Sequence, residues 1–242
     1  MTVQNTLVEK PQKKLSAEYE INGEKMTLSA ATIKNYLVSG GGEVTDQEIV
    51  MFLSLCKYQK LNPFLKEAHL IKYGNSPATI VVGKEVFTKR AKKNPHYRGK
   101  QAGIIVQDAD GQIVEREGTF YLPNETIVGG WAKVYIDGYE KPEYAAVSFE
   151  EYVGRKKDGA TNSQWATKPA TMIRKVALVQ ALREAFPEDF TGMNAPEEFA
   201  EANDIVFEPE QIDGEAENPV EVIEPAADEQ PQDDVRAALL GK

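Results

Sequence analysis

The 242-residue sequence has one cysteine, two histidines and no long apolar run. A single thiol, Cys56, excludes an internal disulfide framework, and with only His69 and His96 beside it the chain lacks ligands for a structural zinc site. No stretch approaches the ~18 apolar residues that cross a bilayer, and residues 1–15 lack the apolar segment of a secretory signal. These absences predict a cytoplasmic globular protein in which Cys56 is a small core residue.

Charge is distributed unevenly along the chain. The net charge is −10, yet residues 187–242 carry 17 acidic and two basic side chains, and residues 57–100 carry eleven basic and two acidic ones. A local positive excess of this size attracts polyanions. A solvated basic surface without a ligand explains the same charges equally well, so charge alone leaves both interpretations open.

Composition divides the chain into three parts. Residues 1–22 are polar and are expected to form a flexible arm, whereas residues 23–190 have the apolar periodicity of a folded domain. Residues 191–242 are rich in acids and proline and cannot bury enough apolar surface to offset the entropy of ordering, so we expect most of this tail to be disordered. Residues 235–240, at its end, are compatible with a short helix that docks on a partner.

Within the domain we expect an α+β fold in which antiparallel β-hairpins pack with helices. The clearest helix start is Thr45, whose hydroxyl can form a capping box with Glu48. The expected elements, in order, are a helix over 29–39, a helix from 45 to about 61, two short strands within 67–82, a helix over 84–94, an antiparallel sheet over 101–149 with turns at Asp110-Gly111 and Asp137-Gly138, a mobile basic loop over 155–161, and a helix from Pro169 to about 186.

Motifs of catalytic sites are incomplete in this sequence. Gly83-Lys84 follows a strand, but Glu85 stands where a phosphate-binding loop has Ser or Thr. Asp108 and Asp110-Gly111 imitate the start of a calcium loop without its bidentate glutamate, and a hairpin turn explains them better. A two-metal nuclease needs clustered carboxylates, which only acids from distant segments would supply here. We therefore expect no enzyme activity, no catalytic residue and no metal site.

Basic residues of two helices are better placed for a function. On the helix over 84–94, Lys89, Lys92 and Lys93 fall in one sector opposite Phe87 and Ala91, so three ammonium groups can contact phosphates together. The aromatic residues interleaved with the bases can stack on unpaired bases, although each is also a candidate for the core. These aromatic residues are Phe64, Tyr73, Phe87 and Tyr97.

The last helix carries two arginines on different sides. Arg183 projects within about 20° of Met172 on an apolar stripe, and Arg174 points the other way. A guanidinium on such a stripe either reaches a phosphate or stabilises the C-terminal end of its own helix. Both interpretations of Arg183 stay open.

Several short motifs follow one another over residues 25–190. They are Leu61-Asn62-Pro63-Phe64-Leu65-Lys66-Glu67 after the capped helix, Ile80-Val81-Val82, Asn94-Pro95-x-Tyr97-x-Gly99, and Trp165 followed by Pro169-x-x-Met172-Ile173-Arg174-Lys175 and Ala181-Leu182-Arg183. In this order and spacing they resemble the RecT/Bet (Redβ-type) family of phage single-strand annealing recombination proteins.

The resemblance implies an ATP-independent annealing protein of phage homologous recombination. Such a protein binds ssDNA and the annealed duplex along a positively charged groove, assembles into rings or helical filaments, and acts in the cytoplasm of the bacterial host cell without a membrane partner. The resemblance also implies contacts with a phage exonuclease and with the host single-strand binding protein. No cofactor is expected, and Mg²⁺ is expected at most to modulate DNA binding.

Matching positions carry the DNA contacts of the family over to Lys66, Arg174, Lys175 and Arg183. Some relatives are more basic after the proline of the last helix, where this chain has Ala170 and Thr171. A groove that joins the bases of 84–100 and 155–183 adds further candidates. The full set of candidate DNA-binding residues is Lys66, Lys72, Lys84, Lys89, Arg90, Lys92, Lys93, Arg98, Lys100, Arg155, Lys156, Lys157, Lys168, Arg174, Lys175 and Arg183.

Two functions of other classes remain as alternatives. One is a metal-dependent DNA repair nuclease whose acids converge from distant segments, and the other is a phage assembly or scaffold protein with incidental basic charge. The acidic tail is expected either to compete with DNA for the basic groove or only to increase solubility.

Overall fold

The structure of the chain is a computed structural model that describes residues 15–156 and 158–198. The first 14 residues of the predicted arm, the candidate Lys157 and residues 199–242 of the predicted acidic tail lie outside the described residues. All described residues belong to one compact unit of the chain.

An N-terminal β-hairpin takes the place of the last part of the predicted arm. β1 (Ser16–Ile21) pairs in antiparallel register with β2 (Glu24–Ser29), and Asn22-Gly23 forms the turn with positive φ angles. The Tyr19 hydroxyl donates a hydrogen bond to the Leu61 carbonyl over 2.8 Å and fixes the hairpin to the domain. The prediction of a flexible arm is therefore wrong for residues 16–22, because Ala17, Tyr19 and Ile21 alternate with polar residues and pack inward, a short period of two that the overall polar composition outweighed.

The helix predicted over 29–39 is confirmed only in part. α1 (Ala30–Thr32) begins where the Ser29 hydroxyl accepts the Thr32 backbone N–H over 3.2 Å, and the chain continues as a π-helical turn over Ile33–Leu37. The last two residues form β3 (Val38–Ser39), which pairs in parallel with β4 (Ala68–Ile71). A parallel partner about 30 residues away leaves no local signal in the sequence.

Helix α2 (Asp46–Gln59) begins as predicted. The Thr45 hydroxyl accepts the Glu48 backbone N–H over 3.3 Å, and the Glu48 carboxylate accepts the Thr45 backbone N–H over 2.8 Å, so the capping box is confirmed. The apolar stripe that includes Cys56 is fully buried, which also confirms the expectation for the thiol. Lys60, in the left-handed conformation with φ of 48°, ends the helix.

The two strands predicted within 67–82 are also confirmed. β4 pairs in antiparallel register with β5 (Thr79–Val82), which gives a three-stranded sheet of order β3-β4-β5. α3 (Lys84–Ala91) starts two residues after β5 and buries Phe87 and Ala91, as its periodicity predicts. This helix connects the three-stranded sheet to a larger sheet.

The larger sheet is antiparallel throughout and has the order β7-β6-β8-β9. Asp110-Gly111 and Asp137-Gly138 lie in its turns as predicted, and both glycines have φ of 80°. The sheet begins at Tyr97, four residues before its expected start. Its strands are β6 (Tyr97–Gln107), β7 (Ile113–Glu117), β8 (Thr126–Ile136) and β9 (Glu143–Ser148).

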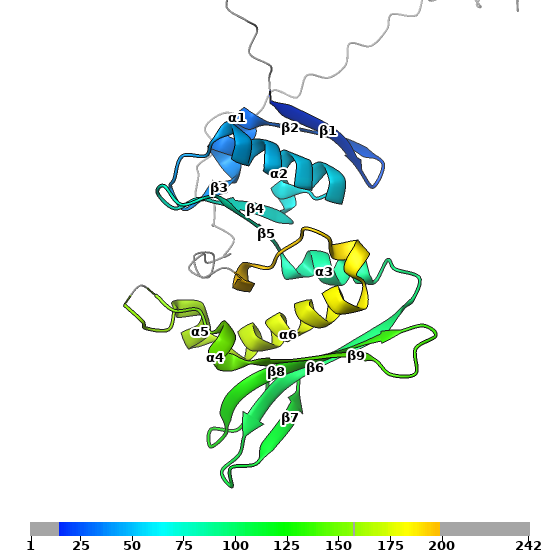
Figure 1. Cartoon of the computed structure of the whole chain (residues 1–242), viewed down its shortest axis with the longest axis vertical. Coiled ribbons are helices and arrows are strands. Elements are labelled where there is room, and N and C mark those ends of the chain that lie inside the picture. Colours follow the sequence, from blue (N-terminus) through cyan, green and yellow to red (C-terminus); the bar gives the residue numbers. More distant parts are fainter. Residues whose placement is uncertain (1–14, 157, 199–242) are drawn as a thin grey trace, which may run out of the picture. The chain divides into compact units, whose positions relative to one another are not determined.

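Helix α6 (Pro169–Ala185) lies along one face of this sheet (Figure 1). The approach is so close that a methyl group on Gly130 of β8 would lie 2.6 Å from the Ile173 carbonyl oxygen, and only glycine fits there. Two short helices, α4 (Phe149–Tyr152) and α5 (Ser163–Thr167), precede α6, and Trp165 of α5 is fully buried. The predicted last helix and its proline start are confirmed.

The chain remains packed on the core after α6. Met193 and Ala195 are buried, and the Asn194 carbonyl accepts the backbone N–H of Val82 over 2.8 Å at the edge of the three-stranded sheet. The disorder expected for most of the tail therefore does not extend to residues 191–198, because a few apolar side chains between the acids suffice to hold this segment. Together, helices and largely antiparallel sheets around a shared core confirm the α+β class.

None of the helices in the described part of the chain is long and apolar enough to cross a bilayer.

Candidate nucleic-acid interface

The bases of α3 are divided between two sides of the helix. Lys84 and Lys92 lie near Lys100 of β6, whereas Lys89 and Lys93 line a pocket next to the β1–β2 turn. The predicted sector of Lys89, Lys92 and Lys93 is thus divided by the packing of α3. The cause is that the two sides of the helix face different neighbours, α6 with β6 on one side and α2 with the hairpin on the other.

The first side forms what we call the cationic track, defined as Lys84, Lys92, Lys100, Arg174 and Lys175. Partial burial and the positive charges of Arg174, Lys84 and Lys92 lower the pKa of Lys100 to about 8. Arg174, Lys84 and Lys92 therefore lie near enough to Lys100 for their charges to disfavour its protonated form. Segments far apart in the sequence, on α3, β6 and α6, therefore meet in one area of high positive charge.

Arg174 is oriented by the larger sheet. Its Nε donates a hydrogen bond to the Ala102 carbonyl of β6 over 3.0 Å, and the side chain is half-buried. This bond holds the guanidinium beside Lys100 rather than in open solvent. Because a guanidinium carries five N–H donors, the remaining donors are available for a phosphate oxygen.

Lys175 ends the cationic track and is paired with an acid of the following segment. Its ammonium contacts the carboxylate of Glu197, whose side chain is only 2% exposed and whose Oε2 lacks a hydrogen-bond partner among the described residues. Burial raises the pKa of Glu85, but its own backbone N–H and the charges of Lys84 and Lys175 lower it overall. Lys84 and Lys175 therefore both act on Glu85, and Lys175 also contacts Glu197.

The cationic track has more positive than negative charge. Lys92 and Lys100 form no ion pair with any residue of the described part, whereas Lys84 contacts Glu85 and Lys175 contacts Glu197. Mutual repulsion in a partly desolvated site is relieved when an external anion binds. The arrangement is suited to a phosphate backbone.

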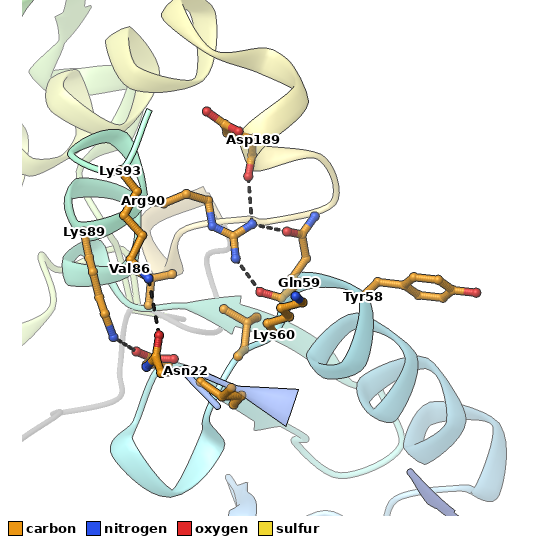
Figure 2. A pocket seen from close by; sticks show the side chains of 12 residues that line it. Asn22, Tyr58, Gln59, Lys60, Val86, Lys89, Arg90, Lys93 and Asp189 are labelled. Atoms are coloured by element: carbon orange, nitrogen blue, oxygen red, sulfur yellow. Dashed lines mark hydrogen bonds and ion pairs between the residues drawn. The ribbon is translucent and has the colours of Figure 1, made fainter. Parts of the chain in front are cut away.

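The second side of α3 faces a pocket of about 330 Å³ (Figure 2). The Lys89 ammonium lies 2.7 Å from the Glu67 carboxylate, and the Lys93 ammonium donates to the Asn22 side-chain oxygen over 3.4 Å. Arg90 has a structural role, because its guanidinium binds the Gln59 carbonyl and side-chain oxygen, and the Asp189 carbonyl at 2.9 Å. It joins the ends of α2 and α3 to the turn after α6.

Lys72 does not belong to either side. Its side chain, directly after β4, is buried, and its ammonium lies 2.7 Å from the carboxylate of Glu48 in α2. A phosphate cannot reach this ammonium while the pair is intact, so we leave Lys72 out of the proposed interface. The basic spacing in the sequence does not reveal that Glu48 both caps α2 and neutralises Lys72.

The other candidate bases are not part of the cationic track, and two of them form ion pairs with acids close to them. Arg98 pairs with Asp137 over 2.8 Å, and Arg155 pairs with Glu150 over 2.7 Å. Arg183 is half-buried near the end of α6, and three further lysines are exposed to solvent without an ion pair to a described residue. These are Lys66, Lys156 and Lys168.

The four aromatic candidates differ in exposure. Phe87 is fully buried and stacks on Phe190 with ring centroids 5.3 Å apart, so no base can stack on it in this fold. Tyr97 is half-buried, with its ring tilted against Phe186, and Tyr73 packs beside the three-stranded sheet. Phe64 is 51% exposed. We therefore remove Phe87 from the candidates for stacking.

Sequence reasoning overlooked two residues of the site. Glu197 falls in the segment predicted to be disordered, and only the neighbouring apolar pair Met193 and Ala195 signals that this segment packs. Tyr58 is 84% exposed on α2, on the side away from the buried stripe, where an aromatic residue is unexpected. That mismatch with the helical periodicity was the available signal.

The described residues offer little for metal or thiol chemistry. No three side chains among His, Cys, Asp and Glu gather there as a metal site. Burial raises the pKa of the Cys56 thiol to about 12, so it stays protonated.

Comparisons with known proteins complete the description of the site. Over 136 residues the chain is 31% identical to an uncharacterized protein, UU154, of Ureaplasma parvum serovar 3; the alignment covers 56% of this chain. The chain spans about half the length of this curated relative, 52%. The sequence model of the RecT family matches residues 23–213, which include both sheets and every base of the cationic track. With most of its length in this match, the chain belongs to the RecT family.

Proposed function

We propose that the protein is a single-strand annealing protein of DNA recombination that holds one DNA strand along the cationic track. Family membership supports annealing in phage recombination. The single observation that carries the assignment to residues is the convergence of Lys84, Lys92 and Arg174 on Lys100. A site of this kind neutralises phosphates without reading base edges.

The physical mechanism needs no nucleotide hydrolysis. Two complementary strands repel each other through their phosphates, and cationic side chains along one strand lower this repulsion. Base edges that point away from the backbone contacts stay free to pair. Pairing and stacking then release about 1.4 kcal/mol per step on average, which is enough to drive the reaction in the absence of ATP.

Assembly of several copies would extend the cationic track from one subunit to the next. Five bases neutralise only a few nucleotides, so a stable nascent duplex requires neighbouring subunits in register. Rings or helical filaments with the track on a shared surface meet this requirement. The exonuclease and the host single-strand binding protein remain proposed partners.

An annealing assay with matched variants tests the proposal. Complementary labelled oligonucleotides are mixed with the protein in the absence of ATP, at about 50 mM salt where phosphate contacts are strongest. We expect the wild-type protein to accelerate pairing and Lys92→Gln/Lys100→Met to lose about tenfold in ssDNA affinity, because two phosphate contacts are lost.

The control is Lys57→Gln/Lys141→Gln, which changes net charge equally at two exposed lysines outside the cationic track. It should bind and anneal like the wild type. Pairing no faster than for naked strands would contradict the proposed function, and equal losses in both double variants would contradict the assignment to the track.

A further inference from the structure

A groove runs along the second side of α3, opposite the cationic track. Two adjoining pockets of about 330 Å³ each share Ile21, Asn22, Glu67 and Lys89 among their lining residues. One pocket extends to the end of α2 and the other extends to Phe64 and the outer end of β2. We call the two together the hairpin groove, because the β1–β2 hairpin lines both.

Some charged side chains of the hairpin groove bind other groups of the protein, and others form no ion pair with a described residue. Its acid Glu67 is engaged by Lys89 over 2.7 Å and by the Asn62 backbone N–H over 2.9 Å. Its acid Asp189 accepts from the Asn94 side chain over 2.7 Å. Three bases form no ion pair with a described residue and are exposed, against one further exposed acid, Glu24. These bases are Lys25, Lys60 and Lys93.

Lys60 is held in place by the backbone. It occupies the left-handed position that ends α2, where glycine or asparagine is usual, and its N–H caps the carbonyls of Cys56 and Lys57. Arg90, which also lines the first pocket, joins α2 to α3 through its bond to the Gln59 carbonyl (Figure 2). The ammonium groups of Lys60 and Lys93, which form no ion pair with a described residue, therefore belong to a groove of defined shape.

An exposed aromatic residue lines each pocket of the hairpin groove. Tyr58 is 84% exposed and lines the first pocket, and Phe64 is 51% exposed and lines the second. Exposed aromatic rings and lysines in the lining of the same groove match the pattern by which proteins bind single strands, in which rings stack on bases and ammonium groups contact phosphates. A duplex offers no free base face to such rings.

We propose that the hairpin groove is a second binding site for single-stranded nucleic acid, separate from the cationic track. This inference rests on the proposed annealing function, in which the second site receives the incoming strand while the track holds the first. Its smaller excess of positive charge makes binding weaker and more easily reversed than in the track. A weakly held strand can dissociate and be replaced until a complementary one pairs.

A cross-linking experiment locates the two strands. The photoreactive residue p-benzoylphenylalanine is placed at Tyr58 in the groove or at Thr88, which lies between Lys84 and Lys92 on the track side of α3. Full-length protein is loaded with a first labelled oligonucleotide, freed of excess, and mixed with a second, non-complementary one that carries another label. We expect Thr88 to cross-link mainly the first strand and Tyr58 mainly the second.

A charge variant gives the quantitative test. Lys60→Asn/Lys93→Gln removes both ammonium groups, and asparagine suits the left-handed position of Lys60. We expect second-strand affinity to fall about tenfold through the loss of two phosphate contacts, while first-strand affinity changes less than about twofold. The Lys57→Gln/Lys141→Gln protein should keep both affinities, and circular dichroism melts establish that each variant folds.

The outcomes separate the two proposals. If the groove variant binds the second strand as the wild type does, or if Tyr58 cross-links the first strand as strongly as the second, the hairpin groove is not a second site. The annealing proposal would survive that result. If the wild-type protein binds no strand at low salt, the annealing function itself fails.

Discussion

Two lysines of this protein are partly or fully buried, one beside an acid and the other beside further cations. Lys72, next to the three-stranded sheet, is 6% exposed and lies 2.7 Å from the carboxylate of Glu48. Lys100, in the larger sheet, is half-buried with three other cations around it and forms no ion pair with a described residue. A cation that the fold compensates stabilises the fold, whereas a cation that the fold leaves uncompensated is available to an external anion.

The compensated lysine gives the largest expected effect. The Glu48 carboxylate accepts from Lys72, from the Ala78 backbone N–H and from Thr45, and these hydrogen bonds lower its pKa to about 2. Glu48→Gln should destabilise the protein by about 3–5 kcal/mol, because it leaves a buried ammonium unpaired. Urea unfolding followed by circular dichroism measures the loss.

Two controls distinguish this pair from a general charge effect. Glu140→Gln removes an exposed acid and should leave the free energy of unfolding unchanged, and Glu48→Gln/Lys72→Met should recover part of the loss. In acid the wild-type contribution, present above the unfolded pKa of Glu48, should disappear as the pH falls towards 2. A stable Glu48→Gln protein would show that Lys72 is not compensated by this acid.

The uncompensated lysine should behave in the reverse way. Lys100→Met removes the repulsion among the track cations and should raise the melting temperature by about 2–4 °C, while it weakens DNA binding. In the wild type the folded pKa of about 8 is below the ordinary value, so stability should rise with pH between about 8 and 10.5. A melting temperature that falls in Lys100→Met would show that Lys100 stabilises the fold.

Lys175 is an intermediate case, because Glu197 compensates it from a segment outside the helix. Glu197→Gln should increase ssDNA affinity about threefold at low salt, since one more ammonium becomes available to a phosphate. Fluorescence anisotropy with an oligonucleotide measures the change, and Glu188→Gln, at an exposed acid after α6, is the matched control. An affinity that stays the same would assign the pair to stability alone.

The smallest expected effect is the pH dependence of DNA binding. Phosphates favour the charged form of Lys100, so the DNA-bound protein retains a proton that the free protein loses above about pH 8. Affinity should therefore fall about threefold between about pH 7 and pH 9 at constant salt. In Lys100→Met this dependence should be absent, and a persistent slope in that variant would point to another titrating group.

Local patterns in the sequence predict much of the fold. The capping box at Thr45, the turn at Asp110-Gly111 and the proline start at Pro169 depend on neighbouring residues, and all three are confirmed. The failures involve long-range contacts or weak periodicity. β3 pairs with a strand about 30 residues later, and residues 191–198 are held by an edge strand and by Lys175.

The sequence predicts which basic residues belong to the candidate site, but it does not predict which of them are paired with acids in the fold. Sequence counting identifies the basic stretch 57–100 and, through the family resemblance, Arg174 and Lys175. It cannot distinguish Lys72, which is buried with Glu48, from Lys100, which is crowded by cations, because partners from other elements decide the role. Helical periodicity likewise groups Lys92 with Lys89, although the packing of α3 separates them.

The contact between Asn194 and β5 determines where the protein can be shortened without damage. A chain cut after Thr191 would lose the buried Met193, the cover of a strand edge and the partner of Lys175 together. Any gain in DNA binding by such a shortened protein would have several causes at once. A chain that ends at residue 198 keeps these three contacts and lacks 13 acids of the full sequence. It therefore allows the electrostatic effect of the C-terminal segment on DNA binding to be measured alone.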